Sequence, residues 1–391
     1  MASLVAALAL PWVVLPLAIF WRARRSRSLS EHHATLPAEA PLVSVIVPAR
    51  NEAHNIARCV RSILASAYPR FELIVVDDLS DDNTRAAANA AAIGDGRLNV
   101  IGAKALPSGW FGKQWACACG ASESRGEILC FTDADTTHGP ELLTRSVNAL
   151  RSLRADLLSV AGMQEMSSFW ERVVQPFMFA LLAARYGGTE AVNESRRMED
   201  KIANGQFLMI RREPYLELGG HGAVRAKVAE DLALAQLFFA KGKRTTLIAG
   251  LDHLSTRMYR SLAEVVEGWM KNVYAGAMDA VPGAGGGDRG SVWRLFVPIL
   301  LVLPMLVVLA PPLMLLLAAF VQMSDAVLLW AAICTGAELM WWAILYGWFL
   351  RISPAYALVF PLGAAVVLYI VVAAILRGRN VTWKDRRYWA E

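Results

Sequence analysis

The stretch EILCFTDADTT, residues 127–137, decides the fold class of this chain. It begins with an apolar run and ends with two acidic residues, Asp133 and Asp135, which one alanine separates. A continuous apolar run of this length predicts a strand that is covered on both faces, as in a parallel sheet. Ligands of such sheets bind beyond the carboxyl ends of the strands. We therefore expect the acidic pair at a ligand-binding edge.

The residues before this stretch repeat the same pattern. Apolar runs that predict strands lie at 43–47, 72–76 and 98–102, and helices are expected at about 55–65 and 113–124. Strands that alternate with helices predict an α/β fold of the Rossmann-like type, with a mostly parallel sheet.

Apolar residues are concentrated at the two ends of the chain. Hydrophobic residues make up 55% of the sequence, and the mean hydropathy of +0.37 exceeds what a soluble domain needs. The excess lies in four runs, at 4–21, 295–320, 326–350 and 355–376. Each run is long enough to cross a hydrocarbon core of about 30 Å, which takes about 20 helical residues. We therefore expect transmembrane helices at both ends.

The expected organisation has five parts. They are an N-terminal membrane anchor at 1–22, an α/β domain at 40–275 that includes a helix in the membrane interface at 168–186, a linker at 276–291, membrane helices at 292–376 and a basic tail at 377–391. The helix at 168–186 is apolar with a few charges, which is typical of interfacial helices. A buried core helix is the alternative.

The charged residues indicate how the chain meets a membrane. The formal net charge is +5, and basic residues gather at 22–27 and 377–387. Basic clusters beside apolar runs mark the cytoplasmic side. We therefore expect an integral protein of the cytoplasmic (inner) membrane whose α/β domain faces the cytoplasm. That domain has no basic face with interleaved aromatic residues, which argues against nucleic-acid binding.

The number of crossings conflicts with this orientation. Four crossings would leave the basic tail outside, against the positive-inside rule, so one run is expected not to cross. The candidates are 4–21 and 295–320, and four prolines favour the second as a re-entrant or interfacial segment. No charge precedes the run at 4–21 and arginines follow it, so we expect a retained anchor rather than a cleaved signal peptide.

Asp133 and Asp135 are candidate metal ligands. Both carry hard oxygen donors, which Mg²⁺ and Mn²⁺ prefer together with phosphate oxygens. Thr137 and His138 follow closely and are candidates to complete the coordination shell, and His253 is a weaker one. The competing interpretation is helix capping, because Pro140 has the position of a first helical residue.

Two further motifs predict a site for a nucleotide. Asp77 and Asp78 end the second strand, where a carboxylate can bind a ribose hydroxyl or a base N–H. Capping of the next helix is the alternative, and we assign that role to Asp81 and Asp82. Lys113, in GWFGKQWA, lies on a glycine-containing loop and is a candidate phosphate ligand, with a solvated lysine as the alternative.

Acidic and basic residues later in the domain have the types that group transfer needs. Glu230 and Asp231 open a predicted helix, and Asp231 is the candidate general base for an acceptor hydroxyl. A simple cap is the competing role. Arg257 and Arg260 are candidates to hold a diphosphate, with contact to the membrane surface as an equal alternative. Glu338, inside an apolar run, is either functional or paired within the helices.

Four segments together resemble the family 2 inverting glycosyltransferases of the GT-A fold. They are SVIVPARNE, VVDDLSDDNT, GEILCFTDADTTH and AEDLALA, and the resemblance covers roughly residues 40–275. The resemblance implies that the nucleotide sugar binds at Pro48, Arg50, Glu52 and the pair Asp77-Asp78. It also implies that Asp133 and Asp135 hold the metal and that the pair Glu230-Asp231 carries the base.

Two other segments, LPSGWFGKQWAC and VTWKDRRY, look more narrowly like bacterial carotenoid, hopanoid-associated and ceramide-type glycosyltransferases. The resemblance implies a lipid acceptor that is reached from the cytoplasmic face. The sequence departs from the QxxRW or RxxRW motif of processive and ceramide-type members, because Ser261 follows Arg260. The departure favours transfer of a single sugar and argues against a ceramide-type assignment.

The resulting expectation is a membrane-bound enzyme that moves one sugar, most plausibly from a UDP-hexose, to a hydroxyl or carboxyl of an apolar lipid, with Mg²⁺ or Mn²⁺ as cofactor. A polyprenyl phosphate acceptor is the alternative within this class. A non-catalytic membrane scaffold that binds nucleotide sugars is the alternative from another class. A transporter is less favoured, because the predicted spans are few and the sequence has a single clear intramembrane acid, Glu338.

Overall fold

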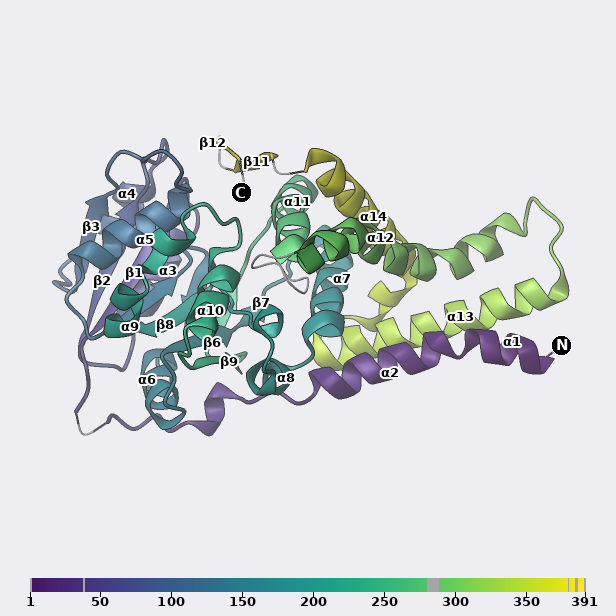
Figure 1. Ribbon diagram of the computed structural model, residues 1–391, viewed down its shortest axis with the longest axis horizontal. Coiled ribbons are helices and arrows are strands. Elements are labelled where there is room, and N and C mark those ends of the chain that lie inside the picture. Colours follow the sequence, from purple (N-terminus) through teal and green to yellow (C-terminus); the bar gives the residue numbers. More distant parts are fainter. Residues whose placement is uncertain (1, 38, 280–287, 379, 384–385, 390–391) are drawn as a thin grey trace. The chain divides into compact units, whose positions relative to one another are not determined.

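The computed structural model describes residues 2–37, 39–279, 288–378, 380–383 and 386–389. The chain divides into two compact units (Figure 1). The α/β unit comprises residues 26–165, 189–258 and 379–391, and the helical unit comprises 1–25, 166–188 and 259–378.

A seven-stranded sheet forms the centre of the α/β unit. Its order is β3-β2-β1-β4-β8-β6-β9. The strands are β1 (Val43–Ala49), β2 (Phe71–Asp77), β3 (Leu98–Gly102), β4 (Ile128–Thr132), β6 (Leu157–Ala161), β8 (Phe207–Arg211) and β9 (Thr245–Ala249). The first four in this order run parallel, as the apolar runs predicted, whereas β8 is antiparallel to both of its neighbours.

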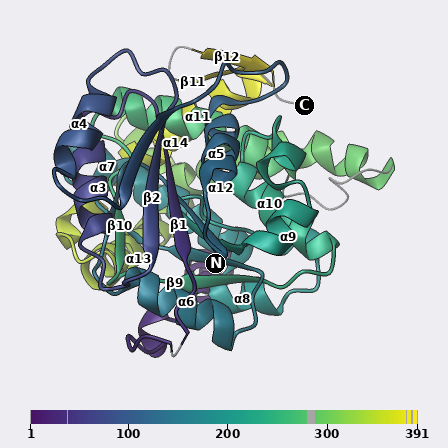
Figure 2. The ribbon, with the colours of Figure 1, turned by 90° about the vertical axis from the view of Figure 1, so that its left-hand side faces the viewer.

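Helices cover both faces of this sheet because alternate side chains of each strand point to opposite faces. The helices are α3 (Ile56–Leu64), α4 (Thr84–Ala91), α5 (Gly112–Glu123), α6 (Leu142–Ser152), α8 (Thr189–Glu194), α9 (Arg212–Glu217) and α10 (Glu230–Ala240). Val45 packs in a core with α3, α4 and α6, whereas Ile46 packs in a second core with α5 and α10. Figure 2 shows β1 and β2 between α3 and α4 on one side and α5 on the other.

A small second sheet replaces an expected helix start. It consists of β5 (Thr136–His138), β10 (Leu254–Thr256) and β7 (Met163–Gln164), in the order β5-β10-β7. The interpretation of this region as a capped helix with Pro140 at its first position is wrong, because α6 begins at Leu142. β-Branched Thr136 and Thr137 fit a strand, and β5 pairs with β10 there.

The helical unit contains the apolar runs. Its helices are α1 (Ala2–Ala9), α2 (Pro11–Ala23), α7 (Phe169–Tyr186), α11 (Leu262–Asp279), α12 (Asp288–Leu317), α13 (Asp325–Ile344) and α14 (Phe360–Arg377). Among the described residues, three helical stretches are long and apolar enough to span a membrane, namely Leu295–Leu317, Asp325–Phe349 and Pro354–Arg377.

The N-terminal run differs from the expectation of a full span. The helix is interrupted at Leu10, between α1 and α2. The apolar helical stretch Ala7–Ala23 is shorter than the three candidate spans. The proline-rich run at 295–320, by contrast, is part of one continuous helix. By length and composition, Leu295–Leu317 could therefore span a membrane, and which of the two runs fails to cross stays a prediction.

The helix predicted at 168–186 is present as α7. Ser168 and Glu171 form a capping box at its start. Of the predicted linker at 276–291, residues 280–287 lie outside the described residues, as do 379, 384–385 and 390–391 of the basic tail. Within the tail, β11 (Asn380–Trp383) pairs with β12 (Arg386–Trp389).

Candidate functional site

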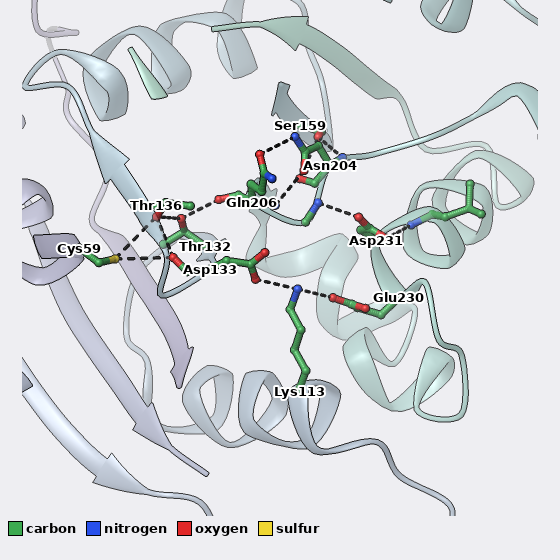
Figure 3. A network of polar contacts seen from close by, with 12 residues as sticks. Cys59, Lys113, Thr132, Asp133, Thr136, Ser159, Asn204, Gln206, Glu230 and Asp231 are labelled. Carbon is green, nitrogen blue, oxygen red and sulfur yellow. Dashed lines mark hydrogen bonds and ion pairs between the residues drawn. The ribbon is translucent and has the colours of Figure 1, made fainter. Parts of the chain in front are cut away.

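The turn after β4 carries the acidic pair. Thr132, the last residue of β4, donates its hydroxyl to the carbonyl oxygen of Gln206 at 2.7 Å. Thr136, the first residue of β5, donates to the carbonyl oxygen of Asp133 at 2.7 Å. These two bonds hold both ends of the turn that carries Asp135 and Asp133, the latter seen in Figure 3.

The environment of Asp135 fits a cation. Its Oδ1 atom is buried and has no hydrogen-bond partner among the described residues. Burial raises the pKa of Asp135 well above its usual value, and the carboxylates of Asp133 and Glu52 raise it further. Burial likewise raises the pKa of Asp133. A divalent cation at Asp133 and Asp135 would relieve this repulsion, and carboxylate oxygens are the donors that Mg²⁺ and Mn²⁺ prefer. Among the described residues, however, no three His, Cys, Asp or Glu side chains are grouped so that they could hold an ion together.

Lys113 connects this turn with the start of α10. Its Nζ atom lies 2.7 Å from Asp133 Oδ1 and 2.7 Å from Glu230 Oε1 (Figure 3). Burial lowers the pKa of Lys113, but the attraction of Asp133, Glu230 and Asp231 outweighs burial and raises it well above its usual value. Lys113 is therefore charged and ion-paired, although 35% of its side chain remains exposed.

Asp231 is held in one orientation by two backbone donors. The N–H of Leu232 donates to Oδ1 at 2.8 Å, and the N–H of Gly205 donates to Oδ2 at 2.7 Å. Burial raises the pKa of Asp231 to about 6, and Glu230 contributes to the rise. The carboxylate is thus ionised at neutral pH, yet it is more basic than an ordinary aspartate. The bond from Leu232 satisfies one backbone N–H in the first turn of α10, and the helix has no side-chain bond at its N-cap residue, Ala229.

The turn at Asn204, Gly205 and Gln206 was missed by the sequence reasoning. Ser159 Oγ accepts from the N–H of Asn204 at 2.6 Å, and Gln206 Oε1 accepts from Gln164 at 2.8 Å. A Cβ atom on Gly205 would lie 3.1 Å from Asp231 Oδ2 and 3.2 Å from Lys113 Nζ. The Asn-Gly pair just before the apolar run of β8 was the available signal, since such pairs mark tight turns.

The nucleotide candidates lie at the ends of β1 and β2. Ala49 pairs with Asp77 in the parallel register, so the two strand ends are adjacent. Arg50 donates to the carbonyl oxygens of Asp78 and Leu79 at 2.7 and 2.8 Å. Asp77 and Asp78 are buried, with exposures of 8% and 5%.

Asp82, not Asp77 or Asp78, caps the helix that follows β2. Its Oδ1 atom accepts from the N–H of Thr84 at 2.9 Å, as predicted, and Asp81 contacts Arg50 instead. Pro48 lies within β1, and Glu52 accepts a bond from Asn55 at 2.8 Å.

The remaining candidate residues for the metal and the diphosphate, apart from Thr137, have partners of their own or lie in the other unit. His138 is buried with Nε2 3.0 Å from Thr132 Oγ1, and burial lowers its pKa to about 3. Thr137 Oγ1 is buried without a hydrogen-bond partner among the described residues. His253 Nε2 lies 3.1 Å from Ser30 Oγ. The N–H of Arg257 donates to the carbonyl of Asp135 at 3.4 Å, while Arg260 belongs to the helical unit.

Comparison with known proteins agrees with this arrangement. Residues 44–219 match the family described as glycosyl transferase family 2. A 4,4'-diaponeurosporenoate glycosyltransferase of Staphylococcus haemolyticus is 29% identical over 245 residues, which cover 61% of this chain and 63% of the relative. The protein of the same name from Staphylococcus aureus is 25% identical over 265 residues, 66% of each chain. The chain thus matches less than two thirds of the length of these relatives.

A solved structure shares the fold over almost the whole chain. The mannosyltransferase from Pyrobaculum calidifontis, in complex with GDP-Man and Mn²⁺, has a TM-score of 0.58 and 21% identity, and the match covers 96% of this chain and 98% of that one. The fold is therefore that of the GT-A glycosyltransferases. More narrowly, residues 44–219 of the α/β unit match the glycosyl transferase family 2, and the chain is similar to carotenoid-type members.

Proposed function

We propose that this chain transfers one sugar, with inversion, from a nucleoside-diphosphate sugar to the hydroxyl or carboxyl group of an apolar, carotenoid-like lipid. The arrangement of Lys113 between Asp133 and Glu230, beside the fixed carboxylate of Asp231, carries this proposal. A UDP-hexose is the donor that we favour. The names of the Staphylococcus relatives support the acceptor class.

The donor would be held by residues at the carboxyl ends of the strands. Asp77, Asp78 and Arg50 would bind the nucleoside, since carboxylates at strand ends suit ribose and base hydrogen bonds. Asp133 and Asp135 would hold Mg²⁺ or Mn²⁺. The bound cation would supply positive charge to the diphosphate oxygens as negative charge develops on them.

Lys113 would act on the leaving group as well. Its ammonium lies next to Asp133, where the diphosphate of a bound donor is expected. A charged donor fixed in a partly buried site stabilises developing charge more than water does. Glu230 would hold that ammonium in place through the second ion pair. Arg257 and Arg260 remain candidates for further contacts with the diphosphate.

Asp231 would act as the general base. The acceptor O–H gives its proton to the Asp231 carboxylate while the acceptor oxygen forms a bond to the anomeric carbon. The bond from that carbon to the diphosphate oxygen breaks, and its electron pair leaves with the nucleoside diphosphate. Attack from the side opposite the leaving group inverts the anomeric carbon. A pKa of about 6 suits this role, because the base is ionised at neutral pH and still attracts a proton.

The apolar helices support a membrane location. Three helical stretches have the length and composition of membrane spans. The basic residues at 22–27 favour the cytoplasmic face of the inner membrane for the α/β unit. We also propose the predicted organisation, with a glycosyltransferase domain at 40–275 and membrane helices at 292–376.

Transfer of a radiolabelled sugar tests the proposal. Purified membranes containing the full chain are offered UDP-glucose, UDP-galactose, UDP-GlcNAc or GDP-mannose with a bacterial lipid extract that contains carotenoids, with and without EDTA. We expect an organic-soluble labelled product that is lost with EDTA and whose donor names the sugar. Label in a mild-acid-labile polyprenyl phosphate would favour the phosphate acceptor. Nucleotide binding without labelled lipid from any donor would support the scaffold.

A further inference from the structure

The burial of one polar side chain in the middle of α7 is not explained by any hydrogen bond within the described residues. Gln175 is 1% exposed, and neither its Nε2 nor its Oε1 atom has a hydrogen-bond partner among the described residues. An unpaired buried polar group destabilises a fold, whereas an apolar residue of similar size does not. We therefore expect an unpaired buried amide to be retained only where it binds a ligand.

The neighbouring polar groups of α7 are satisfied. Glu171 accepts from the N–H of Ser168 at 2.6 Å in the capping box. Pro176 has no N–H, so the carbonyl of Arg172 lacks its helical partner, and Tyr346 donates its hydroxyl there at 3.0 Å. The helix thus provides internal partners at its start and at its proline, but none for Gln175.

A second unpaired donor lies on the helix that packs against this face. Phe179 follows Gln175 by one helical turn, so both project from the same side of α7. The Phe179 ring meets the ring of Trp269 on α11 edge-on, with 5.9 Å between centroids. Trp269 is 7% exposed, and its Nε1 atom also has no hydrogen-bond partner among the described residues.

We propose that Gln175 and Trp269 form a binding site for the polar end of a lipid that carries a hydroxyl or carboxyl group. The site offers two kinds of donor, the Gln175 amide N–H and the Trp269 indole N–H, and one acceptor, Gln175 Oε1. A hydroxyl or a protonated carboxyl both accepts and donates, so it can satisfy all of these atoms. Buried Val174 precedes Gln175 and buried Met178 follows it by three residues, and both offer apolar surroundings for the chain of such a lipid.

The chemistry of these two residues excludes a charged headgroup as the preferred ligand. Neither side chain carries a charge, and burial of a phosphate without a paired cation is costly. The inference rests on the proposed function in one respect, because the acceptor proposed above has the same kind of polar end. The site would then recruit the acceptor lipid.

Binding of all-trans-retinol, a polyene alcohol, tests the site without any sugar transfer. The full chain is purified in detergent, and the rise in retinol fluorescence on binding gives Kd. We expect Gln175→Leu and Trp269→Phe each to weaken binding about tenfold, since each removes hydrogen bonds to the hydroxyl. Retinyl methyl ether, which accepts but cannot donate, should bind the wild type more weakly than retinol and should lose less affinity than retinol does in Gln175→Leu.

A matched control and a stability measurement separate binding from structure. Trp341→Phe removes another buried indole N–H without a partner among the described residues, and it should leave Kd unchanged. Gln175→Leu should melt at the wild-type temperature or above. Equal Kd values for wild type and both site variants would overturn the proposal, as would an effect in Trp341→Phe of the same size. Because no transfer is measured, failure here leaves the glycosyltransferase proposal to its own radiolabel test.

Discussion

Replacement of Asp231 by asparagine distinguishes the structural role of this side chain, as a hydrogen-bond acceptor, from its proposed role as general base. The carboxylate accepts the N–H groups of Leu232 and Gly205, one on each oxygen. Asparagine has a single acceptor oxygen, so one backbone N–H would face an NH₂ group and lose its partner. A buried donor without a partner costs about 1–3 kcal/mol, and we expect a loss of stability of this size.

The effect on catalysis should be larger. A positioned general base contributes about 10²–10⁴-fold to the rate, which corresponds to about 2.7–5.5 kcal/mol in the activation free energy. We therefore expect Asp231→Asn to fold and bind UDP within about threefold of the wild type and to lose transfer by at least about 10²-fold.

The pH profile identifies the base independently. Asp231 must be deprotonated to accept a proton, so activity is present above its pKa and is lost as the pH falls. With a pKa of about 6, wild-type kcat/KM should fall about tenfold per pH unit below pH 6. The residual activity of the variant should lack this acid limb.

The assay compares three purified full-length proteins in detergent between pH 5 and pH 8. Asp156→Asn is the matched control, because Asp156 Oδ2 also accepts a backbone N–H, from Arg244 at 2.8 Å, on an exposed part of the α/β unit. Turnover of Asp231→Asn above about one third of the wild type at pH 7.5, with the acid limb intact, would refute Asp231 as the base. A loss of only a few fold would instead favour a phosphate acceptor, which needs no strong base.

Two further substitutions test the rest of the site. Asp135→Asn should weaken Mn²⁺ binding, measured by electron paramagnetic resonance, by at least about tenfold, because the unpaired Oδ1 loses its charge. It should also raise the melting temperature, since buried like charges are removed; unchanged Mn²⁺ affinity would contradict the metal assignment. Gly205→Ala places a Cβ 3.1 Å from Asp231 Oδ2 and should lower kcat about tenfold with little change in the KM for the donor. An unchanged kcat would show that the turn tolerates the methyl group.

The parallel half of the fold could be predicted because its signals are local. The runs at 43–47, 72–76, 98–102 and 127–131 are apolar strands between helices, and they became β1 to β4 with bounds shifted by one or two residues. Asp133 and Asp231 could be placed for the same reason, since each directly follows or opens a regular element.

The rest of the fold depends on pairing between distant residues. No local pattern states that β8 runs antiparallel between β4 and β6, or that Thr136–His138 pairs with Leu254–Thr256. The link between Gly205 and Asp231 spans 26 positions and uses a backbone N–H, which leaves no trace in residue type. The Asn-Gly turn was visible in the sequence, but its contact with Asp231 was not.

The unpaired buried atoms of Asp135 and Gln175 are the ones that we assign to ligand binding rather than to the stability of the fold. Lys201, although 3% exposed, donates to the carbonyl oxygens of Val192 and Asn193, so its burial is explained by the fold. Glu338 accepts from Trp12 Nε1 at 3.1 Å, which favours its structural role within the helical unit. Asp135 in the α/β unit and Gln175 in the helical unit have no such compensation for their unpaired atoms. Substitutions at these two positions should therefore raise stability while they lower affinity, a combination that a purely structural residue would not give.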